Sequence, residues 1–251
     1  MCTLVAFIHV WPESPLVVAA NRDERLDRAA SGPTRWPGER FFAPRDEQAG
    51  GTWLGLHDSG LFVGVTNRAG AARDGSLASR GQLVVDALRL GSARKVHEAF
   101  STTLDARRYN PFHLLYADRD AAFVTWFDGS LVHQQEPSRG LTVVTERSLG
   151  GDDHGREERV RRQQEPLLAR RAPPALEDLV PTMRGHVDGD PLASTCVHVP
   201  ALGYGTRSSL LLEISADLER SRWLWAEGAP CAVRYREMNV GTRPAVSSNR
   251  H

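Results

Sequence analysis

The sequence predicts an α+β protein in which antiparallel sheets are covered by helices. Short apolar runs rich in Val, Ile, Leu and aromatic residues recur in both halves of the chain and are separated by Asp-Gly, Gly or Pro turns, as in β-hairpins. Segments with apolar residues at helical spacing lie between groups of strands, which is the α+β pattern. With 251 residues, 41% of them hydrophobic, the sequence predicts one domain over residues 1–251.

The predicted strands begin at the amino terminus. Residues 2–10 are apolar and β-prone, and two prolines at 11–15 turn the chain into a second strand. Asp58-Ser59-Gly60 and Asp128-Gly129-Ser130 mark two further hairpin turns between apolar runs. The complete set of predicted strands covers residues 2–10, 16–20, 50–56, 61–67, 112–117, 121–127, 131–135, 141–145, 195–199, 210–214, 222–226 and 231–235.

Helices and loops occupy the remaining segments. Apolar residues at helical spacing predict helices over 82–90, 92–104, 152–171 and 175–186, and Ser92 is the expected N-cap of the second. Residues 27–46 carry three prolines and several arginines, so we expect an irregular loop that forms a lid or a wall of a site. The polar tail 241–251 is expected to be loose.

Composition excludes several classes of function. The formal net charge is zero, so no global field attracts nucleic acid, and no apolar run approaches the roughly 20 residues of a membrane span. The three cysteines form no CxxC motif, and His113 and His133 alternate within predicted strands with no paired ligand at metal-binding spacing. We therefore expect no metal and no cofactor, a reduced cytoplasmic location without a signal peptide, and a small-molecule substrate. The sequence leaves oligomerisation open.

Cys2 is the candidate nucleophile. Removal of Met1 would leave Cys2 with a free α-amine beside its own thiol. The amine has an ordinary pKa of about 7.7–8.0 and the thiol one of about 8.5, so proton transfer between them is close to balanced. A nucleophile activated by a terminal amine is an established arrangement, whereas the alternative is an inert, buried cysteine that acts as a small hydrophobe.

Two polar clusters follow predicted strands. Asn21, Arg22 and Asp23 come directly after the second strand, where they either reach back toward Cys2 or form a solvated turn. Asn67 ends the strand 61–67, where its amide either donates to an oxyanion or closes a turn. The arginines and tryptophans between residues 22 and 53 hint at an anionic or aromatic substrate group. The candidate substrate-binding residues are Asn21, Arg22, Trp53 and Glu146.

A set of short motifs resembles one family. The motifs are Met1-Cys2-Thr3-Leu4, Asn21-Arg22-Asp23-Glu24, Gly51-Thr52-Trp53-Leu54-Gly55, Thr66-Asn67, Arg80-Gly81 and Tyr204-Gly205-Thr206-Arg207-Ser208-Ser209. Together they resemble the NRDE family, also called the transport and Golgi organisation 2 family. That family is similar to the N-terminal-nucleophile hydrolases of the penicillin V acylase and bile-salt hydrolase group. The resemblance implies a four-layer αββα sandwich and hydrolysis of non-peptide amides by a processed N-terminal cysteine.

The resemblance also implies roles for single residues. Cys2 matches the nucleophile, Asp23 the aspartate that binds the terminal amine, Asn67 the oxyanion donor and Arg207 the late arginine near the nucleophile. The arginine three residues before the aspartate falls at Ala20, so Arg22 or Arg25 would have to supply that charge. The acylases and the wider family usually have an asparagine where this chain has Glu146, and an ionised carboxylate cannot donate to an oxyanion.

Two functions from different classes follow. The first is an amide hydrolase that uses Cys2, Asp23, Asn67 and Arg207, with Glu146 either turned away from the substrate or impairing the site. The second is a binding or trafficking protein on the same scaffold for a haem- or lipid-related ligand, because fold does not establish chemistry. For haem, the candidate axial ligands would be His9, His57, His113, His133 and His198.

Overall fold

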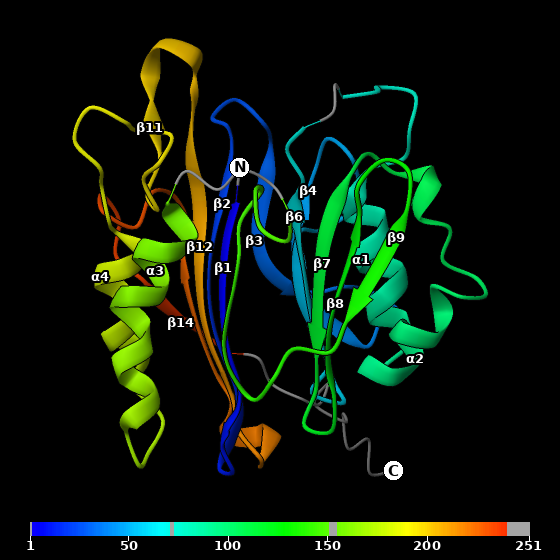
Figure 1. Cartoon of the computed structure of the whole chain (residues 1–251), viewed down its shortest axis with the longest axis horizontal. Coiled ribbons are helices and arrows are strands. Elements are labelled where there is room, and N and C mark those ends of the chain that lie inside the picture. Colours follow the sequence, from blue (N-terminus) through cyan, green and yellow to red (C-terminus); the bar gives the residue numbers. More distant parts are fainter. Residues whose placement is uncertain (1, 71–72, 151–154, 240–251) are drawn as a thin grey trace, which may run out of the picture.

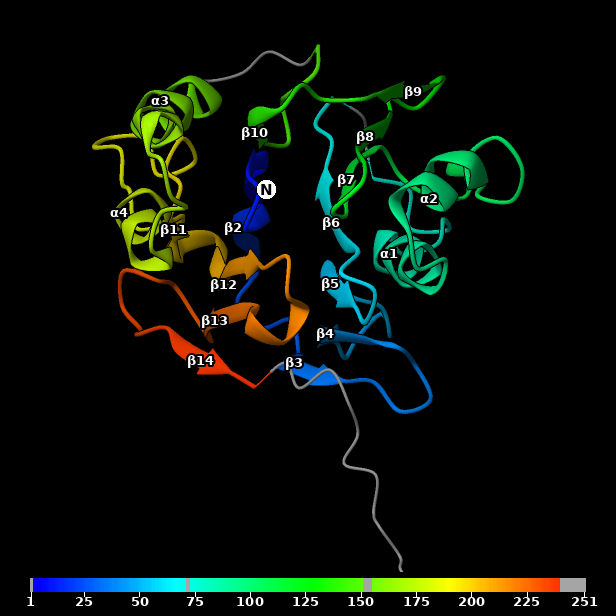
Figure 2. The same ribbon diagram turned by 90° about the horizontal axis from the view of Figure 1, so that it is seen from below.

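The protein is built from two stacked antiparallel sheets between two layers of helices. The computed structural model describes residues 2–70, 73–150 and 155–239, and Figures 1 and 2 show the four layers. This αββα arrangement confirms the predicted fold class. In the described residues, no helix combines the length and the apolar character needed to cross a bilayer.

The first sheet has the strand order β10-β1-β2-β12-β13-β14, with the short β11 paired to β12. Its strands are β10 (Gly140–Val144), β1 (Cys2–Trp11), β2 (Ser14–Arg25), β12 (Tyr204–Ile214), β13 (Arg222–Ala226), β14 (Arg236–Met238) and β11 (His198–Val199). In the register of β1 and β2, Cys2 lies opposite Arg22. In the register of β12 and β2, Thr206 lies opposite Asp23. The start of β1 therefore lies beside the end of β2.

The second sheet follows the chain in simple order from β3 to β9. Its strands are β3 (Ala30–Arg35), β4 (Phe41–Asp46), β5 (Leu54–His57), β6 (Phe62–Asn67), β7 (Phe112–Ala117), β8 (Ala122–Phe127) and β9 (Val132–Gln135). Helices α1 (Arg80–Arg89) and α2 (Ala93–Ala99) cover its outer face, whereas α3 (Arg156–Gln164) and α4 (Val180–Met183) cover the first sheet. Short 3₁₀ turns lie at Ala106–Arg108, Glu165–Ala169, Leu176–Leu179, Pro200–Leu202 and Leu218–Arg220.

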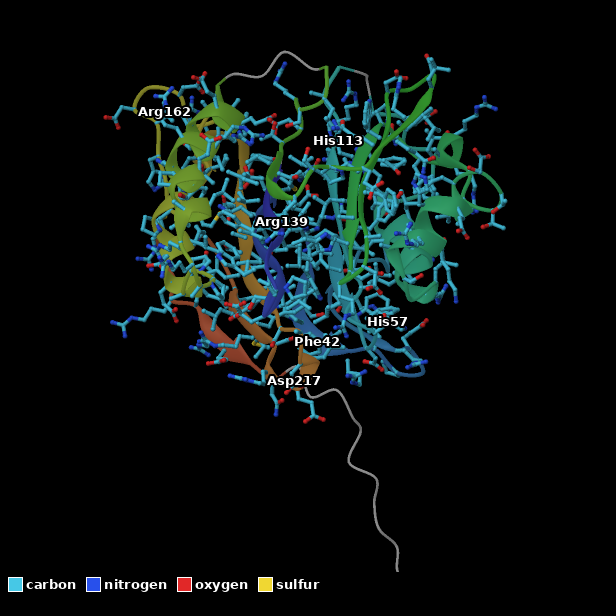
Figure 3. All side chains as sticks on the ribbon, turned by 60° about the horizontal axis from the view of Figure 1, so that its bottom comes forward. Phe42, His57, His113, Arg139, Arg162 and Asp217 are labelled. Atoms are coloured by element: carbon cyan, nitrogen blue, oxygen red, sulfur yellow. The ribbon has the colours of Figure 1, made fainter. Side chains whose placement is uncertain are left out.

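Successive side chains of a strand point to opposite faces of the sheet, one toward the other sheet and one toward the helices. Even-numbered residues of β1, such as Leu4 and Ile8, point into the core between the sheets, where they join Trp223. Odd-numbered residues, such as Val5 and Phe7, pack under the helices. Side chains fill the space between the sheets in Figure 3, and Arg162 extends from α3 to the outer surface. The same alternation places Cys2 on the inner face and Thr3 on the outer face.

Several expected boundaries were wrong. Residues 27–46 contain the hairpin β3–β4 and are not an irregular loop. Pro33 lies in the edge strand β3, and the β3–β4 register shifts between Ser31 and Thr34, so the prolines do not prevent pairing. The helix expected over 92–104 ends at Ala99, although Ser92 caps it as expected. Residues 152–171 and 175–186 hold shorter helices, interrupted by 3₁₀ turns. The strand expected at 231–235 lies instead at Arg236–Met238, and residues 241–251 fall outside the described residues.

Candidate active site

The start of β1 opens into a pocket of about 350 Å³. Side chains from β1, β2, β4 and β6 and from the segment leading into α1 line it. The lining residues are Cys2, Arg22, Asp23, Glu24, Arg28, Asp46, Ala49, Thr52, Trp53, Val65, Asn67, Arg68, Arg73, Asp74, Gly75, Leu77, Ala78, Ser79, Arg80, Gly81, Asn110 and Pro111. The pocket joins the ends of strands from both sheets, and most of its polar lining is charged.

Cys2 is fixed at the pocket by the pairing of β1 with β2, in which it lies opposite Arg22. Its side chain is 7% exposed. Burial raises the pKa of the Cys2 thiol; the charge of Asp23 also raises it, whereas a hydrogen bond to the Asp23 backbone and the charge of Arg22 oppose the rise. Because the thiolate is the reactive form of cysteine, Cys2 could act as a nucleophile here only with a base next to its thiol.

Asp23 lies on β2 beside Cys2 and is 3% exposed. Its Oδ1 accepts a hydrogen bond of 2.6 Å from the Thr206 hydroxyl. Burial raises the pKa of the Asp23 carboxyl to about 7, although the Thr206 hydrogen bond and the charge of Arg156 oppose this. Asp23 is thus a carboxyl group whose charge state changes close to neutral pH.

This raised pKa predicts how stability depends on pH. The pKa of Asp23 in the folded chain, about 7, lies above the ordinary aspartate value of about 3.9, so the folded state binds the proton more tightly. Its stabilising contribution is complete below about pH 4 and is lost as the pH rises through about 7. The unmodified chain should therefore lose up to about 4 kcal/mol of unfolding free energy as the pH rises from about 4 to above 7. We expect this loss to be absent in Asp23→Asn.

Urea unfolding at several pH values between about 4 and 8 measures this difference. Asp120→Asn is the matched control, because Asp120 is an exposed aspartate and its replacement should leave the pH dependence as in the unmodified chain. Parallel pH curves for the unmodified chain and Asp23→Asn would contradict the assignment.

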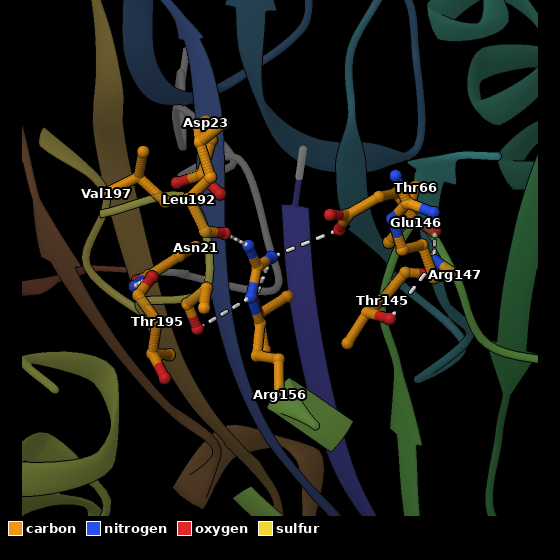
Figure 4. Close-up of polar contacts among 12 residues, drawn as sticks. Asn21, Asp23, Thr66, Thr145, Glu146, Arg147, Arg156, Leu192, Thr195 and Val197 are labelled. Atoms are coloured by element: carbon orange, nitrogen blue, oxygen red, sulfur yellow. Dashed lines mark hydrogen bonds and ion pairs between the residues drawn. The ribbon is translucent and has the colours of Figure 1, made fainter. Parts of the chain in front are cut away.

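A buried polar network lies behind Cys2 on the outer face of the strands (Figure 4). Arg156 Nη1, at the start of α3, lies 3.1 Å from Oε2 of Glu146 and 3.5 Å from the hydroxyl of Thr3. Its other nitrogens donate to the carbonyls of Leu192 and Ala193. Both charged side chains are almost fully buried, 3% exposed for Arg156 and 8% for Glu146. Arg156 therefore joins α3, the end of β10 and the 192–193 loop.

The arginines on the inner side of the pocket differ in their pairing. Arg22 Nη2 lies 2.8 Å from Oδ2 of Asp46, and Arg28 Nε lies 2.7 Å from the same oxygen. Arg80 donates to the carbonyl of Pro111 at 3.0 Å, and among the described residues it forms no ion pair within 4.0 Å. Burial lowers the pKa of Arg80 and the charge of Cys2 raises it. Arg80 is therefore a half-buried cation beside Cys2 with N–H donors that are not used in ion pairs among the described residues.

The position of Arg80 depends on a close backbone contact between Gly51 and Gly81. The loop before β5 meets the first turn of α1, where Thr52 N donates to the Gly81 carbonyl at 3.2 Å. A Cβ on Gly51 would lie 2.4 Å from the carbonyl carbon of Gly81, a distance that requires backbone movement. Only glycine fits at position 51 without displacing α1 and, with it, Arg80.

We therefore expect Gly51→Ala to destabilise the protein by about 1–3 kcal/mol, the usual range for overpacking. Chemical denaturation measures the effect. Gly75→Ala is the control, because a Cβ on Gly75 meets nothing within 4 Å and the same change in composition should have little effect. Equal unfolding free energies for the two variants would contradict this, because they would show that α1 can move away from residue 51 without loss of stability.

The structure brings some of the candidate residues together and separates others. Cys2, Arg22, Asp23, Trp53 and Asn67 all line the pocket. The other three candidates, Asn21, Glu146 and Arg207, do not line it.

Each of these three side chains is held elsewhere. Asn21 Nδ2 donates to the carbonyls of Met183 and Thr195. Glu146 pairs with Arg156. Arg207 lies at a bulge in β12, lines a separate pocket and has Nη1 3.8 Å from Oε1 of Glu227.

Sequence reasoning assigned no role to Arg80, Thr206 or Arg156. Arg80 and Thr206 lie in motifs that carry the family resemblance, so the motifs were a signal for their position. Arg156 lies in a run of charged residues with nothing to distinguish it from its exposed neighbours. No histidine is among the pocket-lining residues, all of which belong to the described part of the chain. A cluster of His186, Cys196, His198 and Cys231 outside the pocket has the atoms to hold a metal.

The αββα fold is similar to that of solved structures whose names describe an acid amidase and a bile acid hydrolase. An N-acylethanolamine-hydrolyzing acid amidase ortholog of Caenorhabditis elegans matches with a TM-score of 0.56 and 13% identity, over 84% of this chain and 92% of that one. Two forms of the conjugated bile acid hydrolase of Clostridium perfringens, a mutant and a variant, match with TM-scores of 0.60 and 0.61. Each is 11% identical, over 95% of this chain and 93% of that one. At these identities the likeness defines the fold alone.

The family model described as Transport and Golgi organisation 2 matches residues 1–222. The chain therefore belongs to that family, which confirms the resemblance found in the sequence motifs. The human Transport and Golgi organization protein 2 homolog is 29% identical over 116 residues. This match covers 43% of the chain and 40% of the human protein.

Proposed function

We propose that the protein hydrolyses the C–N bond of a small, non-peptide amide, with Cys2 as the nucleophile after removal of Met1. One observation carries the proposal: Cys2 begins a buried strand and lines the same pocket as Asp23 and Asn67. The fold supports it, since structural neighbours include proteins named as an amidase and as a bile acid hydrolase.

In the proposed reaction the α-amine of Cys2 accepts the thiol proton, which compensates for the effect of burial on the thiol pKa. The thiolate attacks the amide carbonyl, and the oxyanion accepts a hydrogen bond from Asn67. The C–N bond breaks as the α-ammonium passes its proton to the leaving nitrogen. Water then attacks the thioester, the acid is released and the thiol re-forms. Asp23, in its ionised form, accepts a hydrogen bond from the α-ammonium and orients it.

The pocket suggests the chemical class of substrate. Arg80 and Arg22 contribute positive charge to the pocket that Cys2 lines, and Trp53 adds an aromatic side chain. Asp46 already pairs with Arg22, whereas Arg80 keeps donors for a ligand. We therefore propose an acyl amide that carries an anionic group, with Arg80 as the main contact to that group.

The direct test uses the full-length, purified chain. Intact mass spectrometry first reports whether Met1 has been removed. The chain is then incubated with matched pairs of N-acyl amides, one member with a carboxylate on the amine part and one without. We expect acid release, preference for the carboxylate member, and a transient acyl mass on the peptide that contains Cys2. A processed chain that releases no acid from any substrate of the panel would contradict the proposal.

A further inference from the structure

Four side chains with metal-ligating atoms converge outside the Cys2 pocket. His186 follows α4, Cys196 lies just before β11 and His198 is its first residue. Cys231 lies in the loop between β13 and β14. One ligand atom from each residue lies within 4.8 Å of the other three. Cys196 and Cys231 are 35 residues apart in the sequence, so the cluster exists only in the folded chain.

We propose that His186, Cys196, His198 and Cys231 bind one Zn²⁺ ion in a structural site. The two sulfur atoms are 3.5 Å apart. His198 Nε2 lies 3.5 Å from the sulfur of Cys196 and 3.0 Å from that of Cys231. Tetrahedral zinc with bonds of about 2.3 Å to sulfur and about 2.0–2.1 Å to nitrogen needs S–S edges of about 3.8 Å and S–N edges of about 3.6 Å. The distances among Cys196, His198 and Cys231 differ from these edges by about 0.1–0.6 Å. The ligand atom of His186 lies within 4.8 Å of the other three and has to move closer when the ion binds.

The four ligand atoms, two sulfurs and two imidazole nitrogens, favour zinc over magnesium or calcium. Two thiols and two imidazoles form the Cys₂His₂ combination of structural zinc sites, whereas magnesium and calcium prefer oxygen ligands. Four protein ligands fill a tetrahedral zinc and leave no position for a substrate. A disulfide accounts less well for the cluster, because the sulfur atoms are not at the bonded distance of about 2.05 Å and both imidazoles would have no role.

The cluster lies behind the candidate active site. The backbone N–H groups of Thr195 and Cys196 donate to the Gly185 carbonyl at 3.1 and 3.0 Å, which brings His186 next to Cys196. Val197 exchanges hydrogen bonds with Thr206, one with the Thr206 hydroxyl at 2.8 Å and one with its backbone N–H at 2.9 Å. That hydroxyl donates to Asp23. The zinc would therefore join the 185–198 segment to the Cys231 loop and hold Thr206 in place.

Metal content tests the proposal independently of any activity. The full chain is expressed in zinc-supplemented medium, purified under reducing conditions and analysed by elemental mass spectrometry, with one zinc per chain expected. Replacement by Co²⁺ should give the visible absorption of tetrahedral cobalt together with a thiolate charge-transfer band. A reduced chain that neither contains zinc nor takes it up on titration would overturn the proposal, as would a Cys196–Cys231 disulfide that persists in its place.

Variants assign the ligands. His186→Gln changes an exposed side chain and should weaken zinc binding more than about tenfold. His133→Gln is the control, because His133 lies on β9 of the other sheet and bonds Asp128; it should bind zinc as the unmodified chain does. Cys2→Ala should also retain one zinc, which separates this site from the proposed catalysis. Equal zinc affinity in His186→Gln and His133→Gln would remove His186 from the site.

Discussion

Cys2→Ala is expected to lower kcat/KM for any amide that the protein hydrolyses by about 10⁴-fold or more, the scale seen when a catalytic nucleophile is removed. Alanine keeps the strand and its α-amine but has no atom that can form the thioester. The side chain of Cys2 is small and only one of many in the core around β1, so the fold should persist. Steady-state kinetics on the best amide of the panel measure the effect.

Two further measurements make this result specific. Cys2→Ser retains a nucleophilic atom of lower reactivity, and its activity should lie between those of the unmodified chain and Cys2→Ala. Zinc content and the midpoint of urea unfolding should be close to those of the unmodified chain in both variants. Turnover by Cys2→Ala at the unmodified rate would exclude Cys2 as the nucleophile and leave the pocket without an assigned reaction.

Arg156→Met is expected to destabilise the protein by about 3–5 kcal/mol, because it leaves the buried Glu146 carboxylate without its partner. Arg156 and Glu146 are 3% and 8% exposed, so solvent compensates little for the loss. The carbonyls of Leu192 and Ala193 lose donors as well. Chemical denaturation at neutral pH measures the change.

The chain offers a matched control on the same helix. Arg162 pairs with Glu158 at 2.8 Å, but both side chains are 73% exposed, so Arg162→Met should change stability by less than about 0.5 kcal/mol. The double variant Arg156→Met, Glu146→Gln should recover part of the loss, because the uncompensated charge is removed. Equal decreases in unfolding free energy for Arg156→Met and Arg162→Met would show that the buried Arg156–Glu146 pair adds nothing to stability.

Much of the fold was predictable because the strand signals are local. The apolar, β-prone run of β1, the two-proline turn before β2 and the Asp-Ser-Gly turn before β6 specify hairpins without reference to the rest of the chain. The position of Cys2 opposite Arg22 follows from one such hairpin. The grouping of Cys2 with Arg22 and Asp23 thus rests on adjacent segments, and it was accessible from sequence.

The parts that sequence reasoning missed depend on distant segments. Residues 30–35 pair with 41–46 although prolines and polar residues obscure the strand pattern. Glu146 meets Arg156 because β10 and α3 pack together, and no periodicity marks that pair. The separation of Cys196 from Cys231 concealed their convergence, since ligand spacing in sequence detects only local sites.

The position of Cys2 has a practical consequence. Cys2 is both the first residue of β1 and part of the surface around the 350 Å³ pocket, so any group attached to its nitrogen starts at that pocket. An affinity tag fused ahead of Cys2 would compete with ligands for the same volume and would block the α-amine that the proposed reaction requires. Preparations for kinetics or crystallographic soaking should carry their tag at the other terminus.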